Sequence, residues 1–245
     1  MRHDKELVKR RFTRSLAAYD SIAVVQREIA VRLAGLIESH ASSMTKGIEI
    51  GAGTGFLTRE LVRMYPETRW ITNDIVERSR QYIPEGNNIE FRAADGEYMP
   101  LGKDNDLVAS ASTVQWFDSL KGFISHAAAS LASGGLLALS TFGPDNFREI
   151  TATTGNALEY YPADQIAGWM TETRLEVVVE EQWKQSLTFD SPVEVLRHIK
   201  ATGVNAIDKK RWTHSRLKQF EDEYRRMYDP VTLTFDPIII IARKK

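Results

Sequence analysis

A glycine cluster directly after a short β-branched run is the clearest chemical feature of the sequence, in the stretch GIEIGAGTG that ends at Gly55. A β-branched run favours a strand, and a helix-like segment follows the glycines at once, so a tight turn joins the two. Such a turn exposes backbone N–H groups to a ligand at the start of a helix. The spacing of Gly51, Gly53 and Gly55 is G-x-G-x-G, which fits neither the dinucleotide fingerprint nor the phosphate-binding loop.

Glu49 precedes the first glycine by two positions and completes the pattern E-x-G-x-G-x-G. This pattern resembles motif I of the class I S-adenosylmethionine-dependent methyltransferases. The resemblance implies S-adenosylmethionine as cofactor and S-adenosylhomocysteine as product. It also implies that the glycines pass close to the methionine part and that Glu49 attracts the α-ammonium group. The alternative is that the glycines only form a tight strand–helix turn.

Two further acids follow predicted strands, as expected for a nucleotide site. Asp74 ends the second strand, where a carboxylate can accept both ribose hydroxyls; alternatively, it caps the segment that begins at Val76. Asp95 follows the third strand, and the methyltransferase resemblance implies a contact with the adenine amine; alternatively, it bonds its own turn. The remaining predicted cofactor contacts lie beside these elements and are Ile75, Gly96 and Ser112.

Trp116 follows the fourth predicted strand and is a candidate wall for the cofactor and the reacting carbon, although an aromatic residue there is as often plain core. No metal site is predicted, because the five histidines are scattered without ligand spacing. The chain has no cysteine, which excludes disulfides, thiolate zinc sites and cysteine nucleophiles.

The elements that must position these residues alternate between strand-like and helix-like segments, which predicts a parallel sheet with helices on both faces. The fold class is α/β, with a Rossmann-like seven-stranded methyltransferase sheet, an N-terminal helical lid and helical cap insertions. Predicted strands cover 47–50, 70–74, 89–93, 107–111, 136–141, 175–183 and 233–242. Predicted helices cover 4–39, 56–65, 76–82, 120–132 and 166–170, and 190–228 is largely helical. The first of these is interrupted near Tyr19-Asp20-Ser21, where Asp20 or Ser21 could cap a second helix.

Length and composition favour one methyltransferase domain over residues 1–245, with a lid at 1–40 and cap insertions at 143–170 and 190–230. A formal net charge of −1 gives no case for nucleic acid or a membrane as partner. The N-terminus is charged and lacks the apolar core of a signal peptide, and no apolar run is long enough to span a bilayer. We therefore expect a cytoplasmic protein. The sequence does not indicate its oligomeric state.

Ordered motifs along most of the chain resemble one family, the malonyl-acyl-carrier-protein O-methyltransferases (BioC family) of early biotin synthesis. The segments that carry this resemblance are FTRSLAAYD at 12–20, VVQREIAVRL at 24–33, ASTVQWFDS at 111–119, LALSTFGPDNFREI at 137–150, IKATGVNA at 199–206 and the closing strand at 231–242. The chain departs from the family pattern at Ala52, Ser112 and Asp145-Asn146-Phe147.

The resemblance implies methyl transfer to the free carboxylate of malonyl-acyl carrier protein. A carboxylate is already ionised at neutral pH, so no general base is needed. Arg148 is the candidate that grips the malonyl carboxylate; alternatively, it is a helix-surface residue paired with Glu149. Tyr19 is a candidate lid residue whose hydroxyl reaches the carboxylate or the cofactor; alternatively, it packs in the core of the N-terminal helix.

Acyl carrier protein is acidic, so a basic docking face is expected. The two candidate faces are Lys5, Lys9, Arg10, Arg11 and Arg14, or Lys209, Lys210, Arg211, Arg216 and Lys218. Two other functions remain open: a small-molecule carboxyl or carbon methyltransferase on the same scaffold, and a non-catalytic protein that binds S-adenosylmethionine. The strictness of acyl choice between carrier protein and coenzyme A thioesters also stays open.

Overall fold

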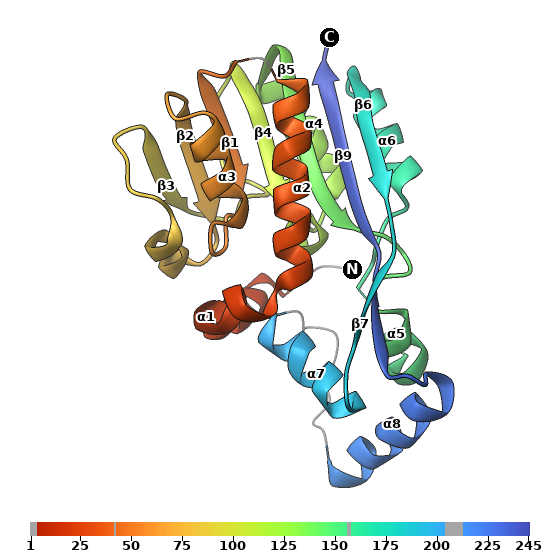
Figure 1. The fold of residues 1–245 in the computed structure, drawn as a ribbon. Helices are drawn as coiled ribbons and strands as arrows, with labels where there is room; N and C mark the ends of the chain where they lie inside the picture. The colour runs from red at the N-terminus through yellow and green to blue at the C-terminus, as the bar shows by residue number, and fades with distance from the viewer. Residues whose placement is uncertain (1–3, 42, 156–157, 204–212) are drawn as a thin grey trace.

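A seven-stranded sheet forms the centre of the computed structural model, which describes residues 4–41, 43–155, 158–203 and 213–245 (Figure 1). Its strands are β1 (Lys46–Ile50), β2 (Arg69–Asp74), β3 (Ile89–Ala93), β4 (Asn105–Ala111), β5 (Leu131–Phe142), β6 (Leu175–Gln182) and β9 (Pro237–Lys244). Their order is β3-β2-β1-β4-β5-β9-β6. The first five strands are parallel, and β9 runs antiparallel to both β5 and β6. The predicted seven-stranded α/β sheet is confirmed.

Helices cover both faces of this sheet because its side chains alternate between two apolar layers. In β4, Leu107 and Ala109 join the core under α2 (Val24–His40) and α3 (Phe56–Met64), whereas Val108 joins the core under α4 (Leu120–Ser130) and α6 (Ala163–Glu172). In Figure 1, α2 crosses the front of the sheet and α4 lies behind it. None of the described helices is both long and apolar enough to cross a membrane.

The remaining elements lie at the carboxyl ends of the parallel strands. The helix α1 (Lys5–Ile22) begins at Asp4, whose carboxylate accepts the Leu7 N–H. The other elements extend below the sheet in Figure 1 and, together with the described residues that connect them to one another and to the sheet, are here called the cap: α5 (Arg148–Thr154), α7 (Pro192–Ala201), α8 (His214–Met227) and the antiparallel pair β7 (Gln185–Thr188) and β8 (Thr232–Phe235). Predicted insertion 143–170 also includes α6, which packs against β6 and α4.

The predicted break in the N-terminal helical region is displaced. The two helices meet at Ala23, and Asp20 and Ser21 both lie inside α1, so neither caps the second helix. Ser21 is accommodated because its hydroxyl donates to the Ala18 carbonyl one turn back (2.8 Å). The segment 76–82 forms a short 3₁₀ helix, η1 (Glu77–Tyr82), rather than an α-helix, and Pro84 disfavours helical backbone just beyond it.

Two predicted strand boundaries are also corrected. The helix α4 ends at Ser130, and β5 begins at Leu131, several residues before the predicted start. The closing strand predicted over 233–242 is divided at Asp236 into β8, which belongs to the cap, and β9, which belongs to the main sheet. The buried Asp236 carboxylate accepts the Asp145 N–H and the Gln182 amide, which pins the chain where it passes from one sheet to the other.

Candidate active site

A cavity of about 1270 Å³ opens at the carboxyl ends of β1, β2 and β4, between α1 and the cap. This volume includes the solvent-filled opening of the cavity. The structure brings ten of the predicted site residues to its wall: Tyr19, Glu49, Gly51, Gly53, Asp74, Ile75, Asp95, Gly96, Ser112 and Trp116. Two predicted residues, Gly55 and Arg148, are not part of the wall.

The glycine turn after β1 adopts left-handed backbone at Gly51 (φ 73°), Gly53 (φ 57°) and Gly55 (φ 77°), which explains the residue type at each position. A Cβ on Gly51 would lie 2.2 Å from the Thr113 hydroxyl, so the turn packs directly on the end of β4. A Cβ on Gly53 would meet nothing nearer than the Phe12 ring at 3.4 Å. Gly53 therefore lies at the cavity wall in contact distance of Phe12, whereas Gly55 serves the turn itself.

Two buried carboxylates face this cavity. Glu49 accepts a hydrogen bond from the Thr58 hydroxyl (2.5 Å), and desolvation raises its pKa to about 7. Asp74 accepts the Gly53 and Val76 N–H groups (both 2.8 Å), so it holds the glycine turn and also bonds the segment it was expected to cap. Desolvation raises the pKa of Asp74 to about 6. Both acids are buried without a paired cation in the described part of the chain, and this arrangement favours a cationic ligand.

Asp95 is joined to α1 by Lys5, an interaction that sequence reasoning missed. The Lys5 ammonium lies 2.7 Å from Asp95 and 2.5 Å from the buried Glu97. Glu97 in turn accepts the Asp118 and Ser119 N–H groups at the start of α4. The Asp95 carboxylate also accepts the Glu97 N–H (3.1 Å), as the turn alternative predicts. The N-terminal end of α1 is therefore held by ion pairs at the predicted adenine side of the cavity.

Strained backbone marks two positions of the cavity wall. Ser112 (φ 51°) and Phe147 (φ 56°) are non-glycine residues in the left-handed region, and such residues concentrate at functional sites. The Ser112 hydroxyl is buried and has no hydrogen-bond partner among the residues that the structure describes. Trp116 ends the short helix η2 (Val114–Trp116) and is partly exposed to the cavity, so it is not plain core.

Tyr19 lies on the cavity side of α1. Its ring contacts Phe12 edge-on (5.1 Å between centroids) and stacks on Phe56 (5.9 Å). Burial, with smaller contributions from the charges of Asp74 and Asp20, raises the pKa of its hydroxyl. This position near Asp74 places Tyr19 at the predicted cofactor end of the cavity.

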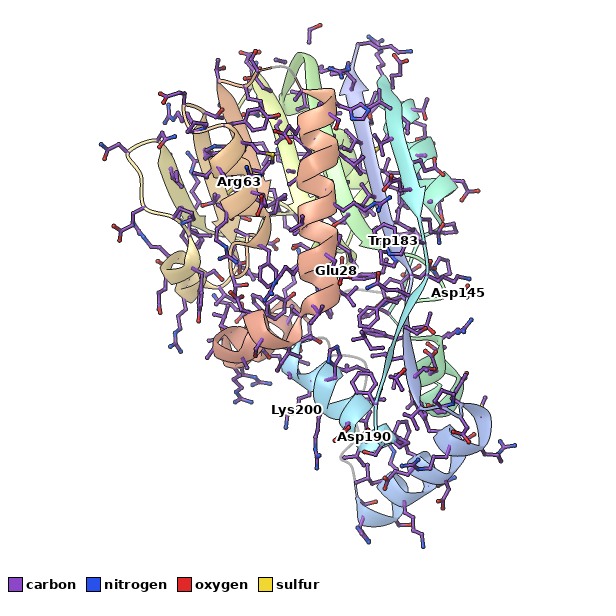
Figure 2. The ribbon with its side chains drawn as sticks, in the orientation of Figure 1. Glu28, Arg63, Asp145, Trp183, Asp190 and Lys200 are labelled. Carbon is purple, nitrogen blue, oxygen red and sulfur yellow. The ribbon has the colours of Figure 1, made fainter. Side chains whose placement is uncertain are left out.

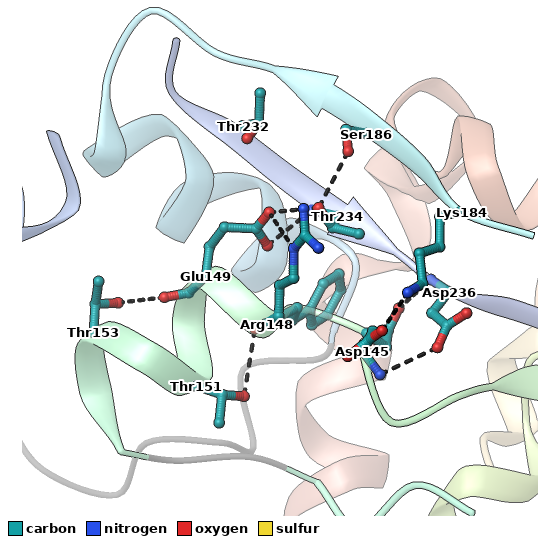
Figure 3. Close-up of polar contacts among 12 residues, drawn as sticks. Asp145, Arg148, Glu149, Thr151, Thr153, Lys184, Ser186, Thr232, Thr234 and Asp236 are labelled. Carbon is teal, nitrogen blue, oxygen red and sulfur yellow. Dashed lines mark hydrogen bonds and ion pairs between the residues drawn. The ribbon is translucent and has the colours of Figure 1, made fainter. Parts of the chain in front are cut away.

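Arg148 begins α5 and is not part of the cavity wall, and its side chain lies beside Glu149 and Thr234 (Figure 3). Its guanidinium lies 3.6 Å from the buried Glu149 carboxylate, and its side chain is 54% exposed. Glu149 itself accepts the Thr234 N–H (2.9 Å) and hydroxyl (2.5 Å), which ties α5 to β8. The placement matches the helix-surface alternative that the sequence left open.

The predicted cofactor fits the residues that line the cavity. Its α-ammonium and sulfonium charges would compensate two buried carboxylates whose pKa values are raised. Gly53 has no side chain where the turn lines the cavity, and the Ser112 hydroxyl, which has no hydrogen-bond partner among the described residues, supplies a polar group beside it. Glu49, Asp74 and Asp95 would hold it, as the sequence predicts.

The two predicted basic faces differ in their relation to the cavity. On α1, Lys5 turns inward to the acids, whereas Arg10 and Arg14 are exposed. Figure 2 shows Lys200 on α7, and the Ser15 hydroxyl of α1 donates to its carbonyl oxygen (3.4 Å). On the other face, Lys209, Lys210 and Arg211 lie outside the described residues, and Arg216 and Lys218 lie on α8, which does not line the cavity.

Comparison with known proteins adds independent findings. A family model described as "Methyltransferase domain" matches residues 48–139. The malonyl-[acyl-carrier protein] O-methyltransferase of Chlorobium luteolum is 38% identical, with 99% of this chain and 96% of the relative covered. The enzyme of the same name from Haemophilus influenzae is 32% identical, with 98% and 95% covered.

Solved structures share the fold at low identity. The N-methyltransferase NodS of Bradyrhizobium japonicum, in complex with S-adenosylhomocysteine, aligns with a TM-score of 0.58 at 16% identity over 97% of this chain and 98% of that one. The 1,6-didemethyltoxoflavin-N1-methyltransferase of Burkholderia thailandensis aligns with a TM-score of 0.59 at 12% identity over 98% and 88%.

Proposed function

This chain belongs to the family of malonyl-[acyl-carrier protein] O-methyltransferases, and we propose on that basis that it methylates the free carboxylate of malonyl-acyl carrier protein. It is an enzyme whose methyl donor is S-adenosylmethionine. The methyl ester produced enters biotin synthesis. The full-length match to curated relatives of this name carries the proposal.

The chemistry needs positioning and desolvation rather than a proton-transfer group. When bound, the cofactor supplies an electrophilic methyl group on a sulfonium. Glu49 would hold the α-ammonium group through its charge, Asp74 would accept hydrogen bonds from the ribose hydroxyls, and Asp95 with Gly96 would border the adenine, since all four residues line the cavity. The acceptor carboxylate is ionised at neutral pH, so its oxygen attacks directly.

Exclusion of water from the cavity favours the reaction, because an anion and a cation combine into neutral products and charge is lost toward the transition state. The residues that keep the acceptor region apolar come from α1, η2, β5 and the cap: Phe12, Trp116, Phe142, Phe147 and Leu158. With α1 fastened by Lys5, these residues wall the reacting groups from solvent.

Methyl transfer from labelled S-adenosylmethionine tests the proposal, with malonyl-acyl carrier protein beside malonyl-coenzyme A as acceptors. We expect the malonyl methyl ester of the carrier protein as product. Absence of transfer to malonyl-acyl carrier protein, with binding of S-adenosylhomocysteine intact, would refute this function. Turnover of small-molecule acids alone would instead indicate a small-molecule carboxyl methyltransferase.

A further inference from the structure

The cap contributes a pair of polar side chains to the cavity wall, Asn146 and Tyr160. Asn146 follows β5 and is 2% exposed, and Tyr160 comes from the segment that leads to α6. The Asn146 amide nitrogen lies 2.8 Å from the Tyr160 hydroxyl oxygen. The two residues therefore act together at the part of the cavity that the cap encloses.

The direction of this hydrogen bond is fixed by the backbone. The Asp236 N–H donates to the Asn146 side-chain oxygen (3.3 Å), which orients the amide so that its nitrogen faces Tyr160. An amide NH₂ group can only donate, so the Tyr160 oxygen is the acceptor. The phenolic proton of Tyr160 is thereby left to donate to a different group, and Tyr160 lines the cavity.

Tyr160 keeps this proton at ordinary pH. Burial raises the pKa of its hydroxyl, and the hydrogen bond from Asn146 offsets only part of that effect. A buried phenol that accepts from an amide and stays protonated is a neutral, oriented hydrogen-bond donor.

The cavity offers an acceptor anion little positive charge. Within residues 4–41, 43–155, 158–203 and 213–245, its wall includes one cationic side chain, Lys5, and that ammonium is bonded to Asp95 and Glu97. Arg148 lies outside the wall. A neutral donor also suits the reaction, because the product ester still accepts its hydrogen bond, whereas a buried guanidinium would lose its counter-charge on methylation.

We propose that Tyr160, oriented by Asn146, donates a hydrogen bond to the acceptor carboxylate and selects an acyl chain that ends in a carboxylate. This inference rests on the proposed function for the identity of the acceptor. Tyr160 touches the substrate, and Asn146 is a positioning residue that acts through it.

Binding of two probes to the full chain saturated with S-adenosylhomocysteine tests the inference: malonyl-pantetheine, which carries the carboxylate, and acetyl-pantetheine, which lacks it. We expect the wild type to prefer malonyl-pantetheine, and Tyr160→Phe to reduce this preference roughly tenfold, the size expected for a hydrogen bond to a charged group. Tyr161→Phe is the matched control, because Tyr161 packs on Trp169 outside the wall.

The substitution Asn146→Asp tests whether the orientation of the Tyr160 hydroxyl matters apart from the packing of the site. A carboxylate at this position accepts the Tyr160 proton, so the phenol turns away from the substrate and the preference is lost although Tyr160 and the shape of the site remain. Affinity for S-adenosylhomocysteine, unchanged in both variants, verifies folding.

Two results would overturn the inference: no preference for malonyl-pantetheine in the wild type, or a preference retained in Tyr160→Phe. If the preference were also lost in Arg148→Ala, the second result would assign the carboxylate contact to Arg148 instead. Failure of the proposed function is distinguishable, because it shows as absent methyl transfer by the wild type. The binding comparison still reports on Tyr160 in that case.

Discussion

Two buried acids at the carboxyl ends of parallel strands are the central residues of the predicted cofactor site. Glu49 and Asp74 are each at most 5% exposed, and their raised pKa values show the cost of keeping charge in a partly dry cavity. A cationic ligand removes that cost. Ligand binding and protonation must therefore compete at these carboxyl groups.

Affinity for S-adenosylmethionine should consequently depend on pH. Between pH 4.5 and about 7 the ligand-free chain holds a proton on Glu49 that the cationic ligand displaces. Affinity should rise with pH across this window, by up to about tenfold per unit. Calorimetry in buffers of different ionisation enthalpy measures the released proton.

Glu49→Gln is the control for this pH dependence, since it removes the titrating group. It should weaken binding at pH 8 and flatten the profile. In the ligand-free wild type the same group makes the free energy of unfolding fall as pH rises from 4.5 to about 7, because the folded state holds the proton more tightly. A pH-independent affinity in the wild type would contradict the role of Glu49.

Residues within one local motif could be predicted from the sequence, and residues assembled by the cap could not. Glu49, Gly51 and Gly53 lie within a few positions of one another, so a strand and a turn are enough to place them. Tyr160 is bonded at the cavity wall by Asn146, which is itself bonded by the Asp236 N–H, and these three residues come from separate parts of the chain. The charge of Arg148 predicts a contact with the malonyl carboxylate, but the direction of its side chain depends on how α5 packs on β8.

At the scale of elements, α1, the predicted lid, contributes one side of the cavity wall. Its Lys5 pairs with the segment after β3; the Lys5 side chain is 17% exposed and that of Glu97 is 2% exposed. The ammonium also lies 4.5 Å from the centre of the Tyr98 ring. Movement of α1 away from the cavity would have to break this polar cluster.

Lys5→Met should loosen this lid. We expect S-adenosylhomocysteine to dissociate several-fold faster and the free energy of unfolding to fall by about 2 kcal/mol, the value for a hydrogen bond to a charged group. Stopped-flow release and urea unfolding measure the two effects. The control is Lys121→Met, which removes an ion pair with Glu172 whose side chains are 54% and 58% exposed and should change neither quantity detectably. Equal effects of the two substitutions would argue against a special role of the Lys5 ion pairs in holding α1 in place.

Within the cap, Glu149 fastens α5 to β8 from a fully buried position. Glu149→Ala leaves the Thr234 N–H unsatisfied and should lower the free energy of unfolding by about 3 kcal/mol. Glu149→Gln keeps an acceptor for that N–H and should cost less. Urea denaturation distinguishes the two variants, and equal losses would show that the cavity left by the side chain matters more than the hydrogen bond.

Element types were predictable from periodicity, but their limits were set by tertiary contacts. No local signal marks Ala23 as the junction of α1 and α2. The run at 233–242 does carry a local signal, Asp236-Pro237, at the point where β8 and β9 divide, although the prediction of one strand passed over it. The division at Asp236 follows from partners on β6 and on the loop after β5. Such partners are invisible in a single sequence.

At the scale of the whole molecule, α1 lines the cavity on one side, and Arg10 and Arg14 are exposed on the same helix. They are four positions apart and so share one helix face. We propose this face as the contact for an acidic carrier protein. Arg10→Glu with Arg14→Glu should raise KM for malonyl-acyl carrier protein at least roughly tenfold at low salt.

The same pair of substitutions should leave KM for malonyl-pantetheine unchanged, because that acceptor lacks the protein. Lys218→Glu on α8 tests the other predicted face by the same assay. A larger effect of Lys218→Glu would move the docking surface to α8. Raising the salt concentration should weaken carrier-protein binding in the wild type and much less in the double variant.

The position of β9 has a consequence for how the chain is made. This strand is the last in sequence, yet it lies between β5 and β6 in the sheet. On the ribosome, the first five strands can associate as they emerge, while β6 must wait without its neighbour until β9 has left the exit tunnel. We therefore expect nascent chains halted before 237 to leave the edge of β5 unpaired and to need protection by chaperones. Once β9 inserts between β5 and β6, that edge is paired and the protection is no longer needed.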